Sequence, residues 1–315
     1  MSTPLSGTTH SGATHSGMPL SSTPLSYAHG TSKTPLLGDT IGQNLARAVA
    51  AWPDRDALVD VAAGARWTYA EFSAAVEELA LGLIGSGVGK GDRVGIWAVS
   101  CAEWVLVQYA TARVGAIMVT INPAYRPHEL AYVLKQSGVS LLVASKEHKA
   151  SDYRAMVEEV RGECPDLRAA HYIADPSWDA LLVAGRSVDV AELRAREAEL
   201  SCDDPVNIQY TSGTTGFPKG ATLSHHNILN NGYWVGRTIG YGEQDRVCLP
   251  VPFYHCFGMV MGNLGATSHG ACVVIPAPSF DPVATLHAVE RERCTSLYGV
   301  PTMFIAELNL ADFAT

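Results

Sequence analysis

Residues Tyr210–Gly220 read YTSGTTGFPKG, and this stretch constrains the chain more tightly than any other. It follows the strand-like run Val206–Gln209. Glycine lets a backbone turn tightly and aim successive N–H groups into one concavity, while hydroxyl groups and a lysine add donors and positive charge. Such a loop suits phosphate oxygens. The P-loop pattern G-x-x-x-x-G-K-[ST] does not fit, because Pro218 precedes Lys219 and Gly220 follows it.

The same loop resembles the signature of the adenylate-forming superfamily, which includes acyl-CoA synthetases, luciferases and the adenylation domains of peptide synthetases. Further landmarks of this family are matched in the right order along the chain by Trp67-Thr68-Tyr69, Gly91–Val94, Pro250–Gly258 and Gly299–Thr302. The similarity runs from about Pro35 to the C-terminus. Among the branches of the superfamily, the chain is most similar to the bacterial medium- and long-chain fatty acyl-CoA ligases.

The resemblance implies an α/β fold, the large N-terminal domain of the acyl-CoA synthetase type, with layers in the order αβαβα and mainly parallel sheets. We expect a disordered tail over residues 1–33, a first α/β subdomain over 34–202 and a second over 203–315. Relatives continue for about two hundred more residues, a size typical of further domain structure. The resemblance therefore implies a fold that is incomplete at the C-terminus, without the C-terminal domain that bears a catalytic lysine, and a fragment inactive alone.

The implied chemistry joins a carboxylic acid to a thiol through an acyl-adenylate, with ATP, Mg²⁺ and coenzyme A as cosubstrates or cofactors. Attack of a carboxylate on a phosphate needs cations and donors that offset growing negative charge. His255 and Lys219 are the predicted catalytic residues, and Thr211 is a predicted Mg²⁺ ligand. The predicted ATP and phosphate ligands are Thr211, Ser212, Gly213, Thr214, Thr215, Gly216 and Lys219.

The acyl pocket is predicted from a stretch without Asp, Glu, Lys or Arg between Arg246 and Asp281. Glycines and prolines interrupt it too often for a transmembrane helix, so buried core and an apolar pocket wall are the two interpretations. By resemblance, the pocket residues are Phe253, Tyr254, His255 and Met259. Segment 253–255 holds no carboxylate for a substrate ammonium group, which favours fatty or aryl acids over amino acids.

Composition is that of an ordinary enzyme. The net charge of −9 argues against a nucleic-acid partner, since phosphate-backbone binding needs clustered basic residues. The seven cysteines form no C-x-x-C pair, which favours a reducing, cytoplasmic location and no metal site. We predict no transmembrane segment, and peripheral membrane contact stays open. Residues 1–33 are rich in Ser, Thr, Gly, His and Pro and are too polar to form a core.

From Pro35 onward, apolar periodicity and capping signals predict strands alternating with helices, the pattern of βαβ crossovers and a mainly parallel sheet. Helices are predicted to begin near Thr68, Ser100, Glu129, Ser224, Gly258, Pro282 and Pro301, and strands to span Arg93–Val99, Ala116–Ile121, Ser140–Ala144, Arg246–Leu249, Ala271–Ile275 and Ser296–Val300. Thr68-x-x-Glu71 and Ser100-x-x-Glu103 are predicted capping boxes. A non-catalytic nucleotide-binding module and a phosphotransferase remain alternatives to the ligase at this point.

Overall fold

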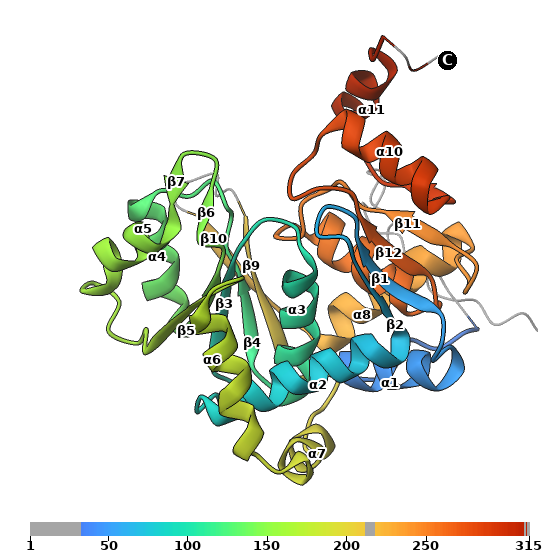
Figure 1. Cartoon of the computed structure of the whole chain (residues 1–315). Coiled ribbons are helices and arrows are strands. Elements are labelled where there is room, and N and C mark those ends of the chain that lie inside the picture. Colours follow the sequence, from blue (N-terminus) through green and yellow to red (C-terminus); the bar gives the residue numbers. More distant parts are fainter. Residues whose placement is uncertain (1–32, 212–217, 312, 314–315) are drawn as a thin grey trace, which may run out of the picture. The chain divides into compact units, whose positions relative to one another are not determined.

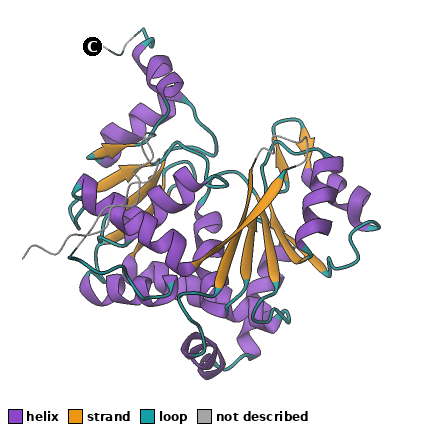
Figure 2. Ribbon diagram, turned by 180° about the vertical axis from the view of Figure 1, so that it is seen from behind, coloured by secondary structure: helices purple, strands orange, loops and turns teal. Residues whose placement is uncertain are grey.

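The computed structural model describes residues 33–211, 218–311 and 313. Its contacts divide the chain into two compact units, Met1–Pro35 and Leu36–Thr315. The tail predicted over residues 1–33 lies outside the described residues, apart from Lys33. Figures 1 and 2 show the second unit from opposite sides.

The larger sheet has six strands in the order β10-β9-β4-β3-β5-β8. The five neighbours from β9 to β8 run parallel, and β10 pairs antiparallel with β9 as an edge strand. The strands are β3 (Arg93–Trp97), β4 (Ile117–Thr120), β5 (Val139–Ala144), β8 (Ala169–Tyr172), β9 (Pro205–Thr211) and β10 (Lys219–Ser224). The predicted strands of this region are confirmed, but β8 and β10 are not among the predicted elements.

A second sheet has five strands in the order β13-β11-β12-β1-β2, and a two-stranded ribbon joins β6 to β7. In the five-stranded sheet, only the β1–β2 pair is antiparallel. The strands are β1 (Asp56–Asp60), β2 (Ala65–Thr68), β6 (Glu147–His148), β7 (Ser151–Asp152), β11 (Arg246–Cys248), β12 (Cys272–Ile275) and β13 (Ser296–Leu297). Both large sheets draw strands from either side of the boundary expected at residue 203.

Helices fill the space between the sheets and cover their outer faces (Figure 1). They are α1 (Ile41–Ala51), α2 (Tyr69–Gly85), α3 (Ala102–Val114), α4 (Pro127–Ser137), α5 (Tyr153–Arg161), α6 (Pro176–Ala184), α7 (Val190–Ala198), α8 (His225–Ile239), α9 (Gly265–Thr267), α10 (Pro282–Glu292) and α11 (Pro301–Leu308), with a 3₁₀ turn η1 (Gly185–Ser187) and a π-helix η2 (Phe257–Leu264).

The layer order αβαβα is confirmed by the contacts of these helices. Helix α3 packs on β1 of the five-stranded sheet and on β3 and β4 of the six-stranded sheet, and nearly all its residues are buried. Burial on every side places this helix inside the core, although it carries a few polar side chains. Helices α4 and α5 pack their apolar sides on the outer face of the six-stranded sheet, and α10 covers β11 and β12.

One of the two predicted capping boxes is confirmed and the other is wrong. Thr68 Oγ1 accepts from the Glu71 N–H at 3.2 Å, and Glu71 Oε2 accepts from the Thr68 N–H at 2.8 Å. At α3, the buried carboxylate of Asp60 accepts from the Ala102 N–H at 3.1 Å instead. An anion at a helix N-terminus is favourable wherever it comes from along the chain. Ser100 is free for another contact, and its Oγ accepts from the Phe253 N–H at 3.4 Å.

Burial explains the charge-free stretch. Segment 247–280 contains β11, η2, α9 and β12, whose side chains are mostly buried in the core. The helix expected from Gly258 is the π-helix η2, which includes Phe257. Within residues 33–211, 218–311 and 313, no helix is both long and apolar enough to span a bilayer.

Candidate functional site

Two loops and three strand ends meet at one edge of the molecule. The carboxyl ends of parallel strands lie together at the same edge of a sheet, which is where α/β folds commonly bind ligands. Here β4 and β9 end beside the segment that follows β11, and they enclose a cavity of about 640 Å³, which we call the hairpin cavity. It is lined by Thr120, Asn122, Tyr125, Glu129, Gln209, Tyr210, Thr211, Pro218, Tyr254, His255 and Cys256.

The β9–β10 hairpin supplies one wall of the hairpin cavity. Thr211 and Lys219 are direct partners in the antiparallel register, so the two stems of the predicted phosphate loop start and end opposite each other. Both residues are exposed, and the Thr211 hydroxyl points towards the Lys219 carbonyl at 3.5 Å. The predicted ligands Ser212, Gly213, Thr214, Thr215 and Gly216 lie outside the described residues.

The His255 segment, residues 252–258, supplies the opposite wall. The His255 side chain is exposed. The backbone N–H of His255 donates to the Pro252 carbonyl at 3.3 Å, and the ring nitrogen Nδ1 accepts from the Phe257 N–H at 3.1 Å. Because Nδ1 is an acceptor, the neutral ring carries its proton on Nε2 and offers a donor. A Cβ on Gly258 would come within 2.6 Å of the Pro252 carbonyl oxygen, so this tight turn requires glycine.

The four predicted acyl-pocket residues divide into two pairs. Tyr254 and His255 line the hairpin cavity. Phe253 and Met259 are fully buried in the core: the Phe253 ring lies 5.6 Å from the Trp104 ring, and the Met259 carbonyl accepts from Gln108 Nε2 at 3.1 Å. The structure does not bring these two to the hairpin cavity, and their role in binding an acyl chain stays a prediction.

Gln209 joins the two walls, and it is absent from the predicted site. Its Nε2 donates to the Tyr254 carbonyl at 2.7 Å, which ties β9 to the His255 segment. Its Oε1 is buried and has no hydrogen-bond partner among the described residues. The available signal was a glutamine in a strand-like run, at a position that the structure buries and where an unpaired polar group is costly.

A second cavity of about 640 Å³ adjoins the first and shares Asn122 and Tyr254 with it. Three basic side chains, Arg126, His148 and Lys149, line this basic cavity, although the chain as a whole carries a charge of −9. The Arg126 guanidinium donates to Ser151 Oγ at 2.9 Å. Partial burial, and then the charge of Lys149, lower the pKa of His148, which favours its neutral form.

Known proteins resemble this chain in sequence and in fold. The model of the AMP-binding enzyme family matches residues 45–315. The Bacillus subtilis protein YngI, named as an acyl-CoA synthetase, is 43% identical over 297 residues, which are 88% of this chain and 54% of that protein. The mitochondrial medium-chain acyl-CoA ligase ACSF2 of Danio rerio is 41% identical over 312 residues, 92% of this chain and 51% of that protein.

Among solved structures, the inhibitor-bound N-terminal domain of FACL13 from Mycobacterium tuberculosis matches with a TM-score of 0.76 and 25% identity, covering 88% of this chain and 67% of that one. The chain thus spans about half the length of the curated relatives it matches. The sequence landmarks, the layered architecture and these matches agree. The chain belongs to the AMP-binding enzyme family.

Proposed function

We propose that this chain contributes the acid-activating site of an AMP-forming acid–thiol ligase. A carboxylate oxygen attacks the α-phosphorus of ATP, pyrophosphate leaves, and an acyl-adenylate forms. The sulfur of a thiol then attacks the acyl carbon, AMP leaves, and a thioester forms. The observation that carries the proposal is the hairpin cavity itself, which sets the stems of the glycine-rich loop against the Nε2–H donor of His255.

Negative charge builds up on phosphate and acyl oxygens in both steps. The walls of the cavity must therefore provide positive charge and hydrogen-bond donors. Thr211 lines the hairpin cavity and adds a neutral hydroxyl donor. Lys219, its partner across the hairpin, is not among the lining residues and adds an ammonium group beside them. On the opposite wall, His255 Nε2–H is suited to orient the carboxylate or to stabilise the α-phosphate oxygens. Such donors stabilise a transition state most when they are held in place before the reaction.

Magnesium fits this site as an ion held mostly by the nucleotide. Mg²⁺ prefers oxygen ligands and commonly uses one or two protein groups together with substrate phosphates. Among the described residues, no three His, Cys, Asp or Glu side chains are grouped to hold an ion. Thr211 Oγ1 and the Glu129 carboxylate are among the oxygen ligands that the hairpin cavity offers. Bound there, Mg²⁺ would offset charge on the triphosphate.

We propose a medium- or long-chain fatty acid as the substrate, on the basis of the names of the relatives and of the cavity lining. Among its described lining residues, Glu129 brings the one carboxylate, and the Arg126 N–H already donates to it at 3.0 Å. One backbone N–H leaves the charge of this carboxylate in place, so the choice of a fatty acid over an amino acid rests on the names of the relatives and on segment 253–255, which holds no carboxylate. Aryl acids remain the competing class.

Coenzyme A is the proposed thiol, and the basic cavity is its proposed site. Its phosphates would face Arg126, His148 and Lys149, and its thiol would reach the acyl-adenylate past the shared residues Asn122 and Tyr254. A cytoplasmic location is part of the proposal, and the Danio rerio relative is named as mitochondrial.

The test is acid-dependent exchange of labelled pyrophosphate into ATP, measured on the protein that carries this chain, with a series of fatty and aryl acids. We expect exchange with fatty acids, release of AMP, and strong loss of exchange in Lys219→Met. The matched control is Lys146→Met, another exposed lysine that lines neither cavity. Exchange with no acid would overturn the ligase function, and release of ADP would point to a phosphotransferase.

A further inference from the structure

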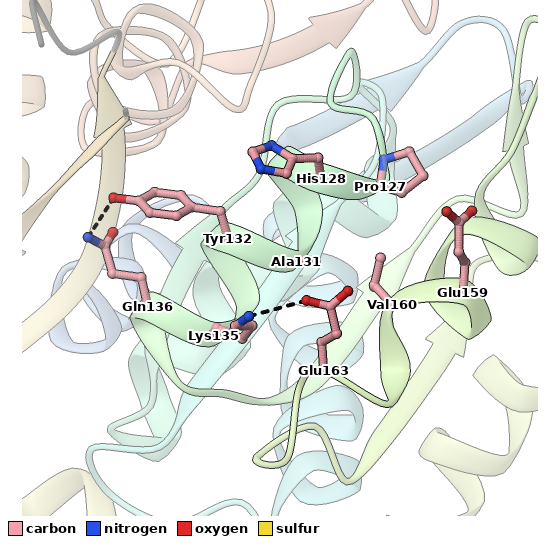
Figure 3. A pocket seen from close by; sticks show the side chains of 9 residues that line it. All are labelled: Pro127, His128, Ala131, Tyr132, Lys135, Gln136, Glu159, Val160 and Glu163. Atoms are coloured by element: carbon pink, nitrogen blue, oxygen red, sulfur yellow. Dashed lines mark hydrogen bonds and ion pairs between the residues drawn. The ribbon is translucent and has the colours of Figure 1, made fainter. Parts of the chain in front are cut away.

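A chain of hydrogen bonds connects helix α4 to both stems of the β9–β10 hairpin. Tyr210 on β9 donates its hydroxyl to Gln136 Oε1 at 2.9 Å. Gln136 Nε2 donates to the Tyr132 hydroxyl at 2.8 Å, the bond drawn in Figure 3. Tyr132 donates in turn to the Pro218 carbonyl at 3.2 Å, immediately before β10. The chain therefore begins on one stem and ends on the other.

Helix α4 is a firm support for these contacts. Tyr132 and Gln136 are four residues apart, so they lie on the same side of the helix. The other side of α4 packs Leu130, Val133 and Leu134 into the core against the six-stranded sheet. The hydrogen bonds thus connect an exposed edge hairpin to a helix that is itself fixed by burial.

The ring of Tyr210 is held in the orientation that this chain needs. Tyr210 faces Gly220 across the hairpin, and a Cβ on Gly220 would lie 3.3 Å from Tyr210 Cζ. The absence of a side chain at residue 220 lets the ring lie close to β10. Burial raises the pKa of Tyr210 to about 12, so its hydroxyl stays protonated and can donate at neutral pH.

Successive residues of a strand face opposite sides. Gln209 therefore binds the Tyr254 carbonyl on one side of β9, while Tyr210 reaches Gln136 on the other. The end of β9 is fixed from both faces, but the start of β10 receives its side-chain support from Tyr132. Pro218 precedes Lys219, so this bond also fixes the peptide from which the predicted phosphate-binding lysine extends.

We propose that Tyr132, Gln136 and Tyr210 are positioning residues for the nucleotide, because they set the spacing between the two stems of the phosphate-binding hairpin. The inference rests on the proposed function. It assigns these residues to the binding of ATP and separates them from the binding of the acid. None of the three residues needs to touch the reacting atoms.

The first test compares Michaelis constants in the pyrophosphate exchange assay. Tyr132→Phe and Gln136→Leu each remove two bonds of the chain. At about 0.5 kcal/mol for each bond the net loss is about 1 kcal/mol, so we expect each variant to raise the KM for ATP about fivefold. The KM for the acid should change less than twofold. Because both residues belong to one chain of bonds, the double variant should raise the KM for ATP by less than the product of the two single increases.

The control is Lys135→Met on the same helix. Lys135 pairs with Glu163 at 3.2 Å across the groove between α4 and α5 (Figure 3). It takes no part in the three hydrogen bonds that connect α4 to the hairpin. This variant should leave both Michaelis constants unchanged. Equal KM increases for ATP and acid in Tyr132→Phe, or an ATP effect as large in Lys135→Met, would overturn the inference.

A second readout does not depend on ligase activity. Amide hydrogen exchange over residues 219–223 reports how firmly β10 is held, and Tyr132→Phe should accelerate it about fivefold while Lys135→Met leaves it unchanged. Unchanged exchange in Tyr132→Phe would overturn the positioning role even in an active ligase. A protein without pyrophosphate exchange would overturn the proposed function, and the amide exchange would still decide the positioning role.

Discussion

The two walls of the hairpin cavity are built in different ways. The His255 segment is tied to the core by the fully buried Phe253 and by the close turn at Gly258. The β9–β10 hairpin lies at the edge of its sheet, and β10 is largely exposed and held by side chains from α4. Core packing positions a group rigidly, while an exposed edge depends on a few hydrogen bonds. The histidine wall should therefore tolerate surface substitutions, and the hairpin wall should not.

The largest expected effect is a loss of stability in the wall that is packed into the core. Phe253→Ala should lower the free energy of unfolding by about 3–5 kcal/mol, because it leaves a cavity beside Trp104. Tyr132→Phe, on the hairpin side, should lower it by less than about 1.5 kcal/mol. Denaturant titrations of both variants make the measurement. Equal losses would mean that the two walls are not built differently.

The next prediction separates the catalytic role of His255 from any contribution of its side chain to stability. His255→Ala should reduce acid-dependent pyrophosphate exchange about 10²-fold, since it removes a donor to developing charge. The free energy of unfolding should hardly change, because the side chain is exposed. The control is His128→Ala, which changes a histidine that is also exposed but lies on α4, and it should keep full exchange. Full exchange in His255→Ala would exclude this role.

The pH dependence of stability tests the far end of the hairpin, where His225 lies. His225 follows β10 directly, is buried, and accepts from the Ile41 N–H through Nδ1 at 3.1 Å. Burial lowers the pKa of His225 to about 4, partly opposed by Asp204. Unfolded histidine binds a proton near pH 6.5, so this contribution to stability is complete above that pH and falls as the pH drops towards 4.

At pH 5 the loss should be about 2 kcal/mol, since one pKa unit corresponds to about 1.4 kcal/mol. Unfolding free energies of the parent and of His225→Gln at pH 7.5 and pH 5 make the comparison. The variant should be less stable at pH 7.5 but should lose less on acidification. The same pH dependence in both proteins would contradict the assignment to His225.

The smallest expected effect concerns Gln209, which connects the two walls. Gln209→Leu removes the donor to the Tyr254 carbonyl and should raise the KM for the acid about threefold to tenfold, because the His255 segment loses its tie to β9. The same variant should change the KM for ATP less than Tyr132→Phe does. The two Michaelis constants of these variants give the result. A larger effect on ATP than on the acid would show that Gln209 supports the hairpin instead.

The parts of the fold that local sequence determines were predictable. Thr68 caps α2 through a residue three positions away, and the βαβ alternation from β3 to β5 follows from periodicity. The cap of α3 was not predictable, because Asp60 lies 42 positions before Ala102. Strand β10 escaped prediction because its exposed residues lack an alternating apolar pattern, and antiparallel pairing with β9 stabilises it.

The candidate site also has parts that local sequence predicts and parts that it does not. The glycine-rich motif pointed to Thr211 and Lys219, and the resemblance of segment 250–258 pointed to His255. The structure places Thr211 and His255, but not Lys219, in the lining of one cavity. The contributions of Gln209 and Tyr132 were not predictable, since each depends on a partner at least 45 residues away. Such contacts arise from the packing of whole elements and leave no pattern in the neighbouring sequence.

The π-helix η2 begins two residues after His255 and has a consequence for insertions and deletions. A π-turn holds one residue more than an α-turn, and a helix rotates by about 100° per residue. Removing one residue from Phe257–Leu264 would let the segment wind as an α-helix and would turn the preceding imidazole away from its present direction. The direction of the imidazole therefore depends on the number of residues in η2 as well as on the glycine at position 258.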